Sequence, residues 1–205
     1  MFQAVSRNAL KLAAMGLAAS AMVGCANVSG PNVGGNVQYG DAKAVETVTN
    51  EFGSTDLQTI AESMTRSLLQ SRPITAPREA PIVTLAEVKN KTSEYIDTRS
   101  ITEKIRTQLV KSGAVRFAVS TNEMQSQVDE LSRQNQSGLY KNAGKAKMGQ
   151  MQGAKYRLEG SISSIVKRSS NVKDVYYIFN LSLINNESGM LEWADDKEIR
   201  KTSAR

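Results

Sequence analysis

Histidine is absent from this 205-residue sequence, cysteine occurs once, and aromatic residues make up only 5% of the chain. Without an imidazole there is no Ser-His-Asp or Cys-His nucleophile system, and no histidine-based proton transfer or metal site. A single cysteine excludes an internal disulfide framework and a cysteine-rich zinc site. We therefore predict a protein that is not an enzyme and that carries no cofactor and no metal.

The amounts of apolar and charged residues are those of a folded domain. Hydrophobic residues account for 40% of the chain and charged residues for 22%. These proportions supply enough apolar material for a core and too little charge for general disorder. At roughly 150 residues per domain, the length allows one domain with an appended tail.

The amino-terminal residues have the pattern of a secretory signal peptide. Arg7 and Lys11 supply positive charge ahead of an apolar run over residues 12–23. This run is too short to cross about 30 Å of membrane hydrocarbon as a helix. A positive start, a short apolar run and then small residues are typical of a cleaved signal, so we leave residues 1–24 out of the fold.

The only cysteine stands at the end of this signal, in the sequence Met22-Val23-Gly24-Cys25. These four residues resemble a bacterial lipobox, in which the cysteine receives a diacylglyceryl thioether and becomes the first residue of the mature chain. We therefore predict lipid attachment at Cys25; the alternative is an ordinary secretion signal with a buried cysteine. The sorting pattern of lipoproteins, with Ala26 next, implies the outer membrane. More than one acyl chain gives stable anchoring, whereas a single chain binds only marginally.

After the signal, the sequence divides into a tether and one domain. Residues 25–53 are rich in Gly, Asn and Val and show no sustained helix or strand period, so we predict a lipidated flexible tether. Apolar residues at helix spacing begin after Ser54. We predict that residues 54–205 form the domain.

Helices and strands alternate in the first part of this domain, and strands alone follow. We expect helices from Ser54 up to Pro73, at two capping boxes that begin at Ser100 and Ser120, and more loosely over 138–152. Strands are expected over 82–88, 115–119, 155–166, 175–184 and 190–199. This order predicts an α/β fold, an α+β sandwich in which helices pack on a mixed sheet.

Four segments of the domain, together with the lipobox, resemble the LpoB family. They are IVTLAEVKNKTSEYIDT, ITEKIRTQLVKSGAVRF, GAKYRLEGSI and SGMLEWADDKEIRK. LpoB proteins are outer-membrane lipoproteins that activate class A penicillin-binding proteins, the bifunctional peptidoglycan synthases. The resemblance implies a fold similar to the N-terminal domain of TolB and a role in stimulating peptidoglycan synthesis. It also implies a place on the inner leaflet of the outer membrane, facing the periplasm.

The most basic stretch of the chain covers residues 138–170, where seven Lys and Arg residues accompany one Glu. Lys145 and Lys147 lie on the loosely predicted helix, and Arg157 and Glu159 lie on the outer face of the strand after it. We predict these four residues as a partner-binding set; the alternative is a solvated polar surface. Nucleic acid is not an expected partner, because the protein is exported and no aromatic residues alternate with the basic ones.

Two patterns in the C-terminal strands have simpler explanations. Alternation over residues 175–184 places Tyr177 and Phe179 in the core, and leaves Tyr176 on the opposite face as a possible partner anchor. Asp195 and Asp196 are adjacent on a strand, so their carboxylates point to opposite faces and do not form a shared cation site.

Three functions from different classes fit these observations. The leading one is a lipid-anchored regulator that acts by binding and is monomeric without its partner. The second is a structural or secretion-associated envelope lipoprotein, similar to those of curli secretion, that assembles with copies of itself. The third is an envelope hydrolase, against which the missing histidine counts.

Overall fold

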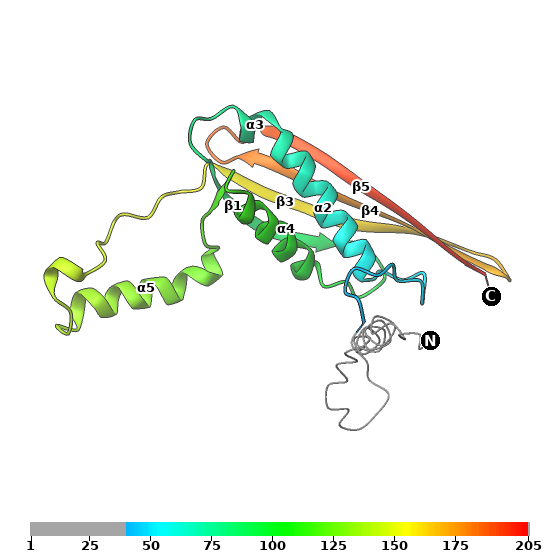
Figure 1. Cartoon of the computed structure of the whole chain (residues 1–205), viewed down its shortest axis with the longest axis horizontal. Coiled ribbons are helices and arrows are strands. Elements are labelled where there is room, and N and C mark those ends of the chain that lie inside the picture. Colours follow the sequence, from blue (N-terminus) through cyan, green and yellow to red (C-terminus); the bar gives the residue numbers. More distant parts are fainter. Residues whose placement is uncertain (1–39, 205) are drawn as a thin grey trace, which may run out of the picture. The chain divides into compact units, whose positions relative to one another are not determined.

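The computed structural model describes residues 40–204, which form a five-stranded mixed sheet with two long helices packed on one face (Figure 1). The predicted class, helices on a mixed sheet, is confirmed. The elements in chain order are α2 (Ser54–Gln70), α3 (Arg72–Thr75), β1 (Ile82–Asn90), α4 (Thr98–Ser112), β2 (Arg116–Phe117), α5 (Thr121–Gln136), the 3₁₀ turn η1 (Asn142–Gly144), β3 (Tyr156–Arg168), β4 (Val172–Asn185) and β5 (Leu191–Ala204).

The strands run in the spatial order β2-β1-β3-β4-β5. Strand β1 is parallel to both β2 and β3, whereas β3, β4 and β5 form an antiparallel meander. The β3–β4 ladder is uninterrupted from the pair Tyr156–Asn185 to the pair Arg168–Lys173. The parallel connections carry α4 and α5, as a crossover between parallel strands requires.

The core lies between the sheet and the helices α2 and α4. Every second residue of β4 points into it and is fully buried: Val175, Tyr177, Phe179, Leu181 and Leu183. The helices add residues spaced three or four apart: Ile60, Ala61, Met64 and Leu68 from α2, and Ile101, Ile105 and Leu109 from α4. Each such large side chain contributes about 1.5–3 kcal/mol by leaving water. The prediction that Tyr177 and Phe179 belong to the core is confirmed.

Helix boundaries follow the local capping chemistry. The box at Ser120 is present, because Glu123 Oε2 accepts hydrogen bonds from the Ser120 amide and hydroxyl. The box expected at Ser100 is wrong: α4 begins earlier, and the carboxylate of Asp97 accepts the amides of Arg99 and Ser100. An aspartate N-cap one turn upstream satisfies free amides of the first turn there, as a serine N-cap would at its own position.

The helix expected over residues 138–152 is also wrong, since only η1 forms there. Gly138 and Gly149 take positive φ angles of 74° and 77°, which a helix does not allow. The apolar residues of this stretch meet no core: Leu139 is 80% exposed and Met148 is 55% exposed. Most helical stability comes from packing an apolar face, so a glycine-rich stretch without such packing does not remain helical.

Residues 41–53, which we call the strap, lie against the start of α2 although the sequence favours a tether there. The Gln58 side-chain amide donates to the Ala42 carbonyl at 2.6 Å, and Glu46 Oε2 accepts the Ser54 amide at 2.8 Å. The division of the chain at residues 24 and 53 stays a prediction, and Cys25 and the signal peptide lie outside the described residues.

Candidate functional site: the open face of the sheet

The two faces of the sheet have different surroundings. Helices α2 and α4 pack on one face, and on the other face the β3, β4 and β5 side chains are exposed or half-buried except for Ser161. We call this second surface the open face. Its residues, read from the strand register, are Arg157, Glu159, Ser161, Ser163, Ile165 and Lys167 on β3, the even-numbered residues 174–184 on β4, and the even-numbered residues 194–204 on β5.

Arg157 and Glu159 occupy one end of the open face. Arg157 Nε donates to Glu159 Oε2 at 3.1 Å, and Arg157 also reaches the side-chain oxygen of Asn186 at 3.3 Å. The two side chains of the pair are 40% and 44% exposed. Such an exposed pair adds at most about 1 kcal/mol to stability, so its main effect is to present a fixed donor and acceptor to the solvent.

An apolar and aromatic patch lies further along the open face. Ile165 is 54% exposed and pairs across the ladder with Tyr176, which in turn pairs with Arg200 on β5. Tyr176 is half-buried and Arg200 is exposed, and tyrosine and arginine are among the residue types that dominate binding energy at protein interfaces. The prediction that Tyr176 lies on the face opposite the core is confirmed by its register.

Charged residues hold this patch in place. Arg200 makes two hydrogen bonds to the Asp174 carboxylate, of 3.0 and 2.8 Å. The Asp174 pKa is lowered by these bonds and by the Thr202 hydroxyl. A hydrogen bond to Glu198 raises the pKa of the Tyr176 hydroxyl. The carboxylate is therefore ionised at neutral pH, and the tyrosine remains a neutral hydrogen-bond donor.

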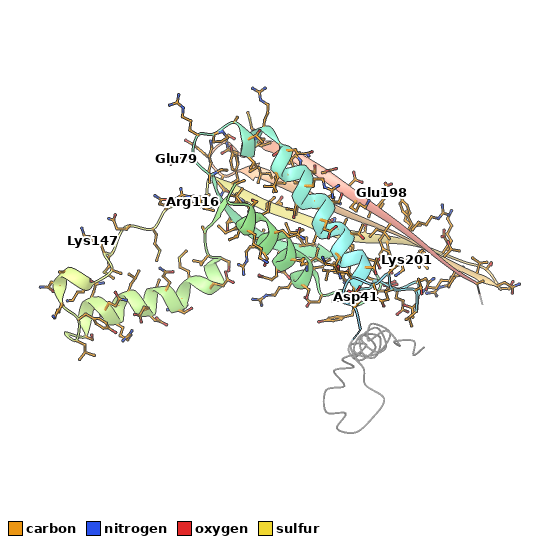
Figure 2. The ribbon with its side chains drawn as sticks, viewed as in Figure 1. Asp41, Glu79, Arg116, Lys147, Glu198 and Lys201 are labelled. Atoms are coloured by element: carbon orange, nitrogen blue, oxygen red, sulfur yellow. The ribbon has the colours of Figure 1, made fainter. Side chains whose placement is uncertain are left out.

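The structure separates the two halves of the predicted binding set. Lys145 and Lys147 flank Ala146, whose amide donates to the Gln134 side chain at 2.9 Å and whose carbonyl accepts from Asn135 at 3.0 Å. These two lysines therefore belong to the segment that follows α5 (Figure 2), whereas Arg157 and Glu159 belong to β3. Among residues 40–204, no hydrogen bond or ion pair joins the two halves.

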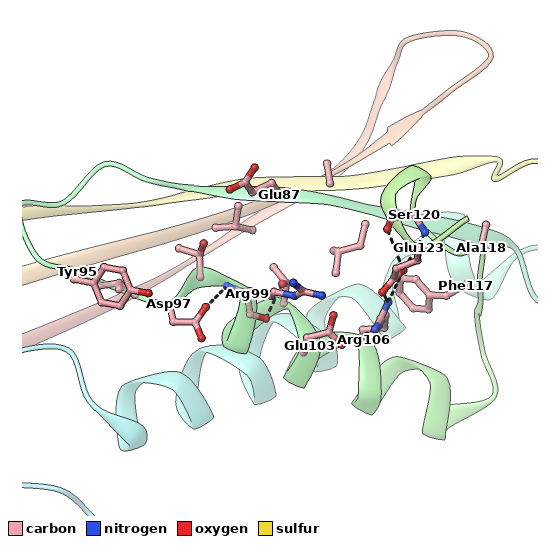
Figure 3. Close-up of a pocket in the computed structure, with 16 residues that line it drawn as sticks. Glu87, Tyr95, Asp97, Arg99, Glu103, Arg106, Phe117, Ala118, Ser120 and Glu123 are labelled. Carbon is pink, nitrogen blue, oxygen red and sulfur yellow. Dashed lines mark hydrogen bonds and ion pairs between the residues drawn. The ribbon is translucent and has the colours of Figure 1, made fainter. Parts of the chain in front are cut away.

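The cleft of about 490 Å³ between β1 and α4 (Figure 3) is not among the sites predicted from the sequence. Arg106 projects into it and contacts Glu103 at 2.6 Å and Glu123 at 3.5 Å. The Ser120 amide and hydroxyl, and then Arg106, lower the pKa of Glu123. Because Arg106 contacts both carboxylates, these groups tie α4 to the first turn of α5. The only sequence signal was the spacing of Glu103 and Arg106 on one helix face.

The described residues contain no group of three or more metal-ligating side chains. Asp195 and Asp196 alternate between the two faces of β5, as their adjacency predicts. In the same part of the chain, the helices are all too short or too polar to cross a membrane.

A sequence model of the family described as "Peptidoglycan-synthase activator LpoB" matches residues 56–199. The chain belongs to the LpoB family. The match covers the sheet, both packed helices and α5, and it confirms the resemblance carried by the four segments. Membership places the chain in a family described as activators of peptidoglycan synthase.

Solved LpoB structures are similar to this chain at low identity. The LpoB C-terminal domain from Salmonella enterica is 15% identical over 71% of this chain and 99% of that chain, with a TM-score of 0.43. The NMR structure of Escherichia coli LpoB is 16% identical over 85% of this chain and 80% of that chain, with a TM-score of 0.42. A PelC dodecamer from Paraburkholderia phytofirmans is 12% identical over 60% and 73% of the two chains, with a TM-score of 0.35. Comparison with curated proteins gives no match.

Proposed function

We propose that this LpoB-family chain is an outer-membrane lipoprotein, anchored through Cys25 in the inner leaflet, that binds and activates a class A penicillin-binding protein. The observation that supports the proposal most is the family match over residues 56–199. Activation follows when the domain binds one state of the synthase more tightly than another, so it needs no chemistry from this chain. Anchoring adds to binding because it raises the local concentration of the domain near its partner.

The open face is the surface that we assign to the synthase. It is the face of the sheet that α2 and α4 leave uncovered, and it combines the Ile165–Tyr176 patch with the Arg157–Glu159 pair. Apolar and aromatic side chains with charged groups near them are typical of a protein interface. Lys145 and Lys147 carry positive charge on the segment that precedes β3 in the sequence. We assign them the role of attracting an acidic surface of the partner and so speeding association.

Polymerisation of lipid II by a class A synthase of the same cell tests the activator role. We expect faster glycan polymerisation when the chain from Ala26 onward is added, and no product from this chain alone. A folded chain that leaves the rate unchanged with every class A synthase of the cell would contradict the proposal. Sedimentation of the same sample should show a monomer; a stable ring would favour the self-assembling alternative.

Substitutions on the open face test its assignment. Tyr176→Ala should weaken binding to the synthase at least tenfold, as expected for an anchor residue. Tyr95→Ala is the matched control, because Tyr95 is 96% exposed but lies on the loop between β1 and α4. Equal effects of the two substitutions would refute the assignment.

A charge reversal tests the steering role separately. Lys145→Glu/Lys147→Glu should slow association more than it speeds dissociation, and the difference should shrink at high salt. The control is Lys104→Glu/Lys111→Glu, which makes the same change in charge at two exposed positions of α4. Unchanged association rates in the first variant would remove these lysines from the proposed binding set.

A further inference from the structure

The strap, residues 41–53, is attached to the domain almost entirely by polar contacts. Its only buried residue is Asn50, which is 8% exposed and whose side-chain amide donates to the Lys173 carbonyl at 3.1 Å. Two of its apolar residues face the solvent: Val45 is 74% exposed and Val48 is 86% exposed. Apart from Phe52, which is half-buried against the core, the strap buries little apolar surface, so it adds less free energy to the folded state than a core strand does.

Two clusters of contacts hold the strap. At its start, Glu46 Oε2 accepts the Ser54 amide at 2.8 Å and the Ser54 hydroxyl at 3.1 Å, and the Glu46 amide donates to the Thr55 hydroxyl at 2.8 Å. These contacts place a carboxylate on free amides at the N-terminus of α2, which favours negative charge.

At its end, the strap crosses the start of α2 and the β4–β5 strands. The Phe52 ring packs edge-on against Tyr177 with centroids 5.8 Å apart, and the Phe52 amide donates to Glu94 Oε2 at 3.2 Å. Lys201 Nζ donates to the Glu51 carbonyl at 2.6 Å. None of these contacts is a hydrogen bond between paired strands. The strap can therefore detach without disturbing the pairing of any strand.

We propose that the strap is a clasp: it detaches reversibly from the domain, and its release sets how far the domain can extend from the membrane. The inference rests on the proposed lipid anchor at Cys25. If the predicted tether is fully extended, the stretch from residue 25 to 41 spans at most ~55 Å while the strap is held, and the stretch from residue 25 to 54 spans at most ~100 Å once the strap is released. Release of the clasp therefore nearly doubles the greatest distance at which the open face can meet a synthase.

Glu46→Ala is the variant that opens the clasp, because the side chain is only half-buried, lies outside the core and makes the contacts to Ser54. Gly53→Ala is a second, independent opener, since a Cβ at residue 53 would contact the Glu46 carboxylate, which must then move. Glu62→Ala is the control: it removes the same charge from an exposed position of α2 that none of the strap's hydrogen bonds reaches.

Hydrogen exchange on the full chain in detergent tests whether the clasp opens on its own. The amides of Glu46, Phe52 and Gly53 each donate within the clasp. In the unmodified chain they should exchange at least about 100-fold faster than β4 amides and at least about 10-fold slower than unprotected ones. In Glu46→Ala and Gly53→Ala, hydrogen exchange of the strap amides should be about fivefold faster, and exchange of the β4 amides should be unchanged. In the Glu62→Ala control, exchange of both sets of amides should be unchanged. Strap amides that exchange at the β4 rate, or at the unprotected rate, would overturn the proposal.

A distance measurement tests the consequence of opening. The acylated chain, with a dye on an introduced Ser188→Cys, is bound to vesicles of phosphatidylethanolamine and phosphatidylglycerol that contain an acceptor-labelled lipid. Energy transfer from the dye to the labelled lipid should fall in Glu46→Ala and Gly53→Ala and stay unchanged in Glu62→Ala. Openers that loosen the strap but leave energy transfer unchanged would overturn the role in reach. A chain that fails to bind the vesicles at all would instead refute the lipid anchor, which separates the two failures.

Discussion

The ion pair between Lys201 and Asp56 joins the edge strand β5 to the first turn of α2, and Lys201→Met should weaken the fold substantially. Lys201 Nζ lies 3.0 Å from Asp56 Oδ2, and the two side chains are only 17% and 6% exposed. Removing one partner of a buried pair costs about 3–5 kcal/mol because the other charge is left uncompensated. Here Asp56 keeps the Gly53 amide at 2.8 Å, so we expect a loss of about 2–3 kcal/mol.

Urea unfolding measures this loss, with the fluorescence of Trp193 as the signal, because this half-buried residue packs against the core from β5. With a slope of about 2 kcal/mol per molar urea, the midpoint should fall by about 1–1.5 M. The double variant Asp56→Asn/Lys201→Met should regain about 1 kcal/mol relative to the sum of the single losses, because it leaves no unpaired charge.

The neighbouring substitution Lys197→Met is the control for that experiment. Lys197 lies four residues from Trp193 on the same face of β5 and borders the groove beside α2. It should change the free energy of unfolding by no more than about 0.5 kcal/mol. A loss below about 1 kcal/mol for Lys201→Met, at an unchanged slope, would refute the argument that burial makes this pair costly to break.

Other predictions concern the sheet and the cleft. Leu181→Ala removes a fully buried β4 side chain and should lower the free energy of unfolding by about 2–5 kcal/mol, measured by urea titration. Gly160→Ala should destabilise the β3–β4 ladder, because its Cβ would meet the backbone carbonyl of Asn180 on β4; unchanged exchange of β3 amides would contradict this. Hydrogen bonds from Ser120, and then Arg106, lower the pKa of Glu123 in the folded protein. The ionised Glu123 therefore stabilises the fold above the pKa that it has in the unfolded chain. This stabilisation is lost as the pH falls through the lower pKa of the folded state. Glu123→Gln should therefore flatten the acid side of the stability-against-pH curve, while leaving the neutral-to-basic side parallel to that of the unmodified chain.

The sheet could be predicted from the sequence because its signals are local. Alternation places Tyr177 and Phe179 on one side of a strand and Tyr176 on the other, whatever the partner strand is. The same holds for the box at Ser120, where both capping groups lie within four residues. Boundaries were less accurate: β4 and β5 each extend beyond the predicted strands, because ladder hydrogen bonds continue through polar residues once two strands are paired.

The strap and the cleft could not be predicted because their contacts join distant residues. At the strap, Lys201 meets Glu51 across 150 positions of sequence, and in the cleft Arg106 of α4 meets Glu123 of α5 across 17. No periodicity within the strap indicates that it is held. The prediction of a helix over 138–152 was wrong because it rested on a weak local pattern. No distant surface covers Leu139, so packing does not stabilise a helix there.

Strand order also has a consequence for how the protein is made. The two helices packed on the sheet, α2 and α4, precede residue 113, but β3 and β4, the strands at the centre of the sheet, lie within residues 156–185. Until those strands have been synthesised, the apolar faces of the two helices have no sheet to cover. A chain exported from its amino end, as the proposed signal peptide requires, therefore stays unable to complete its core while it is being threaded across a membrane. It can fold only when the last strands arrive on the far side.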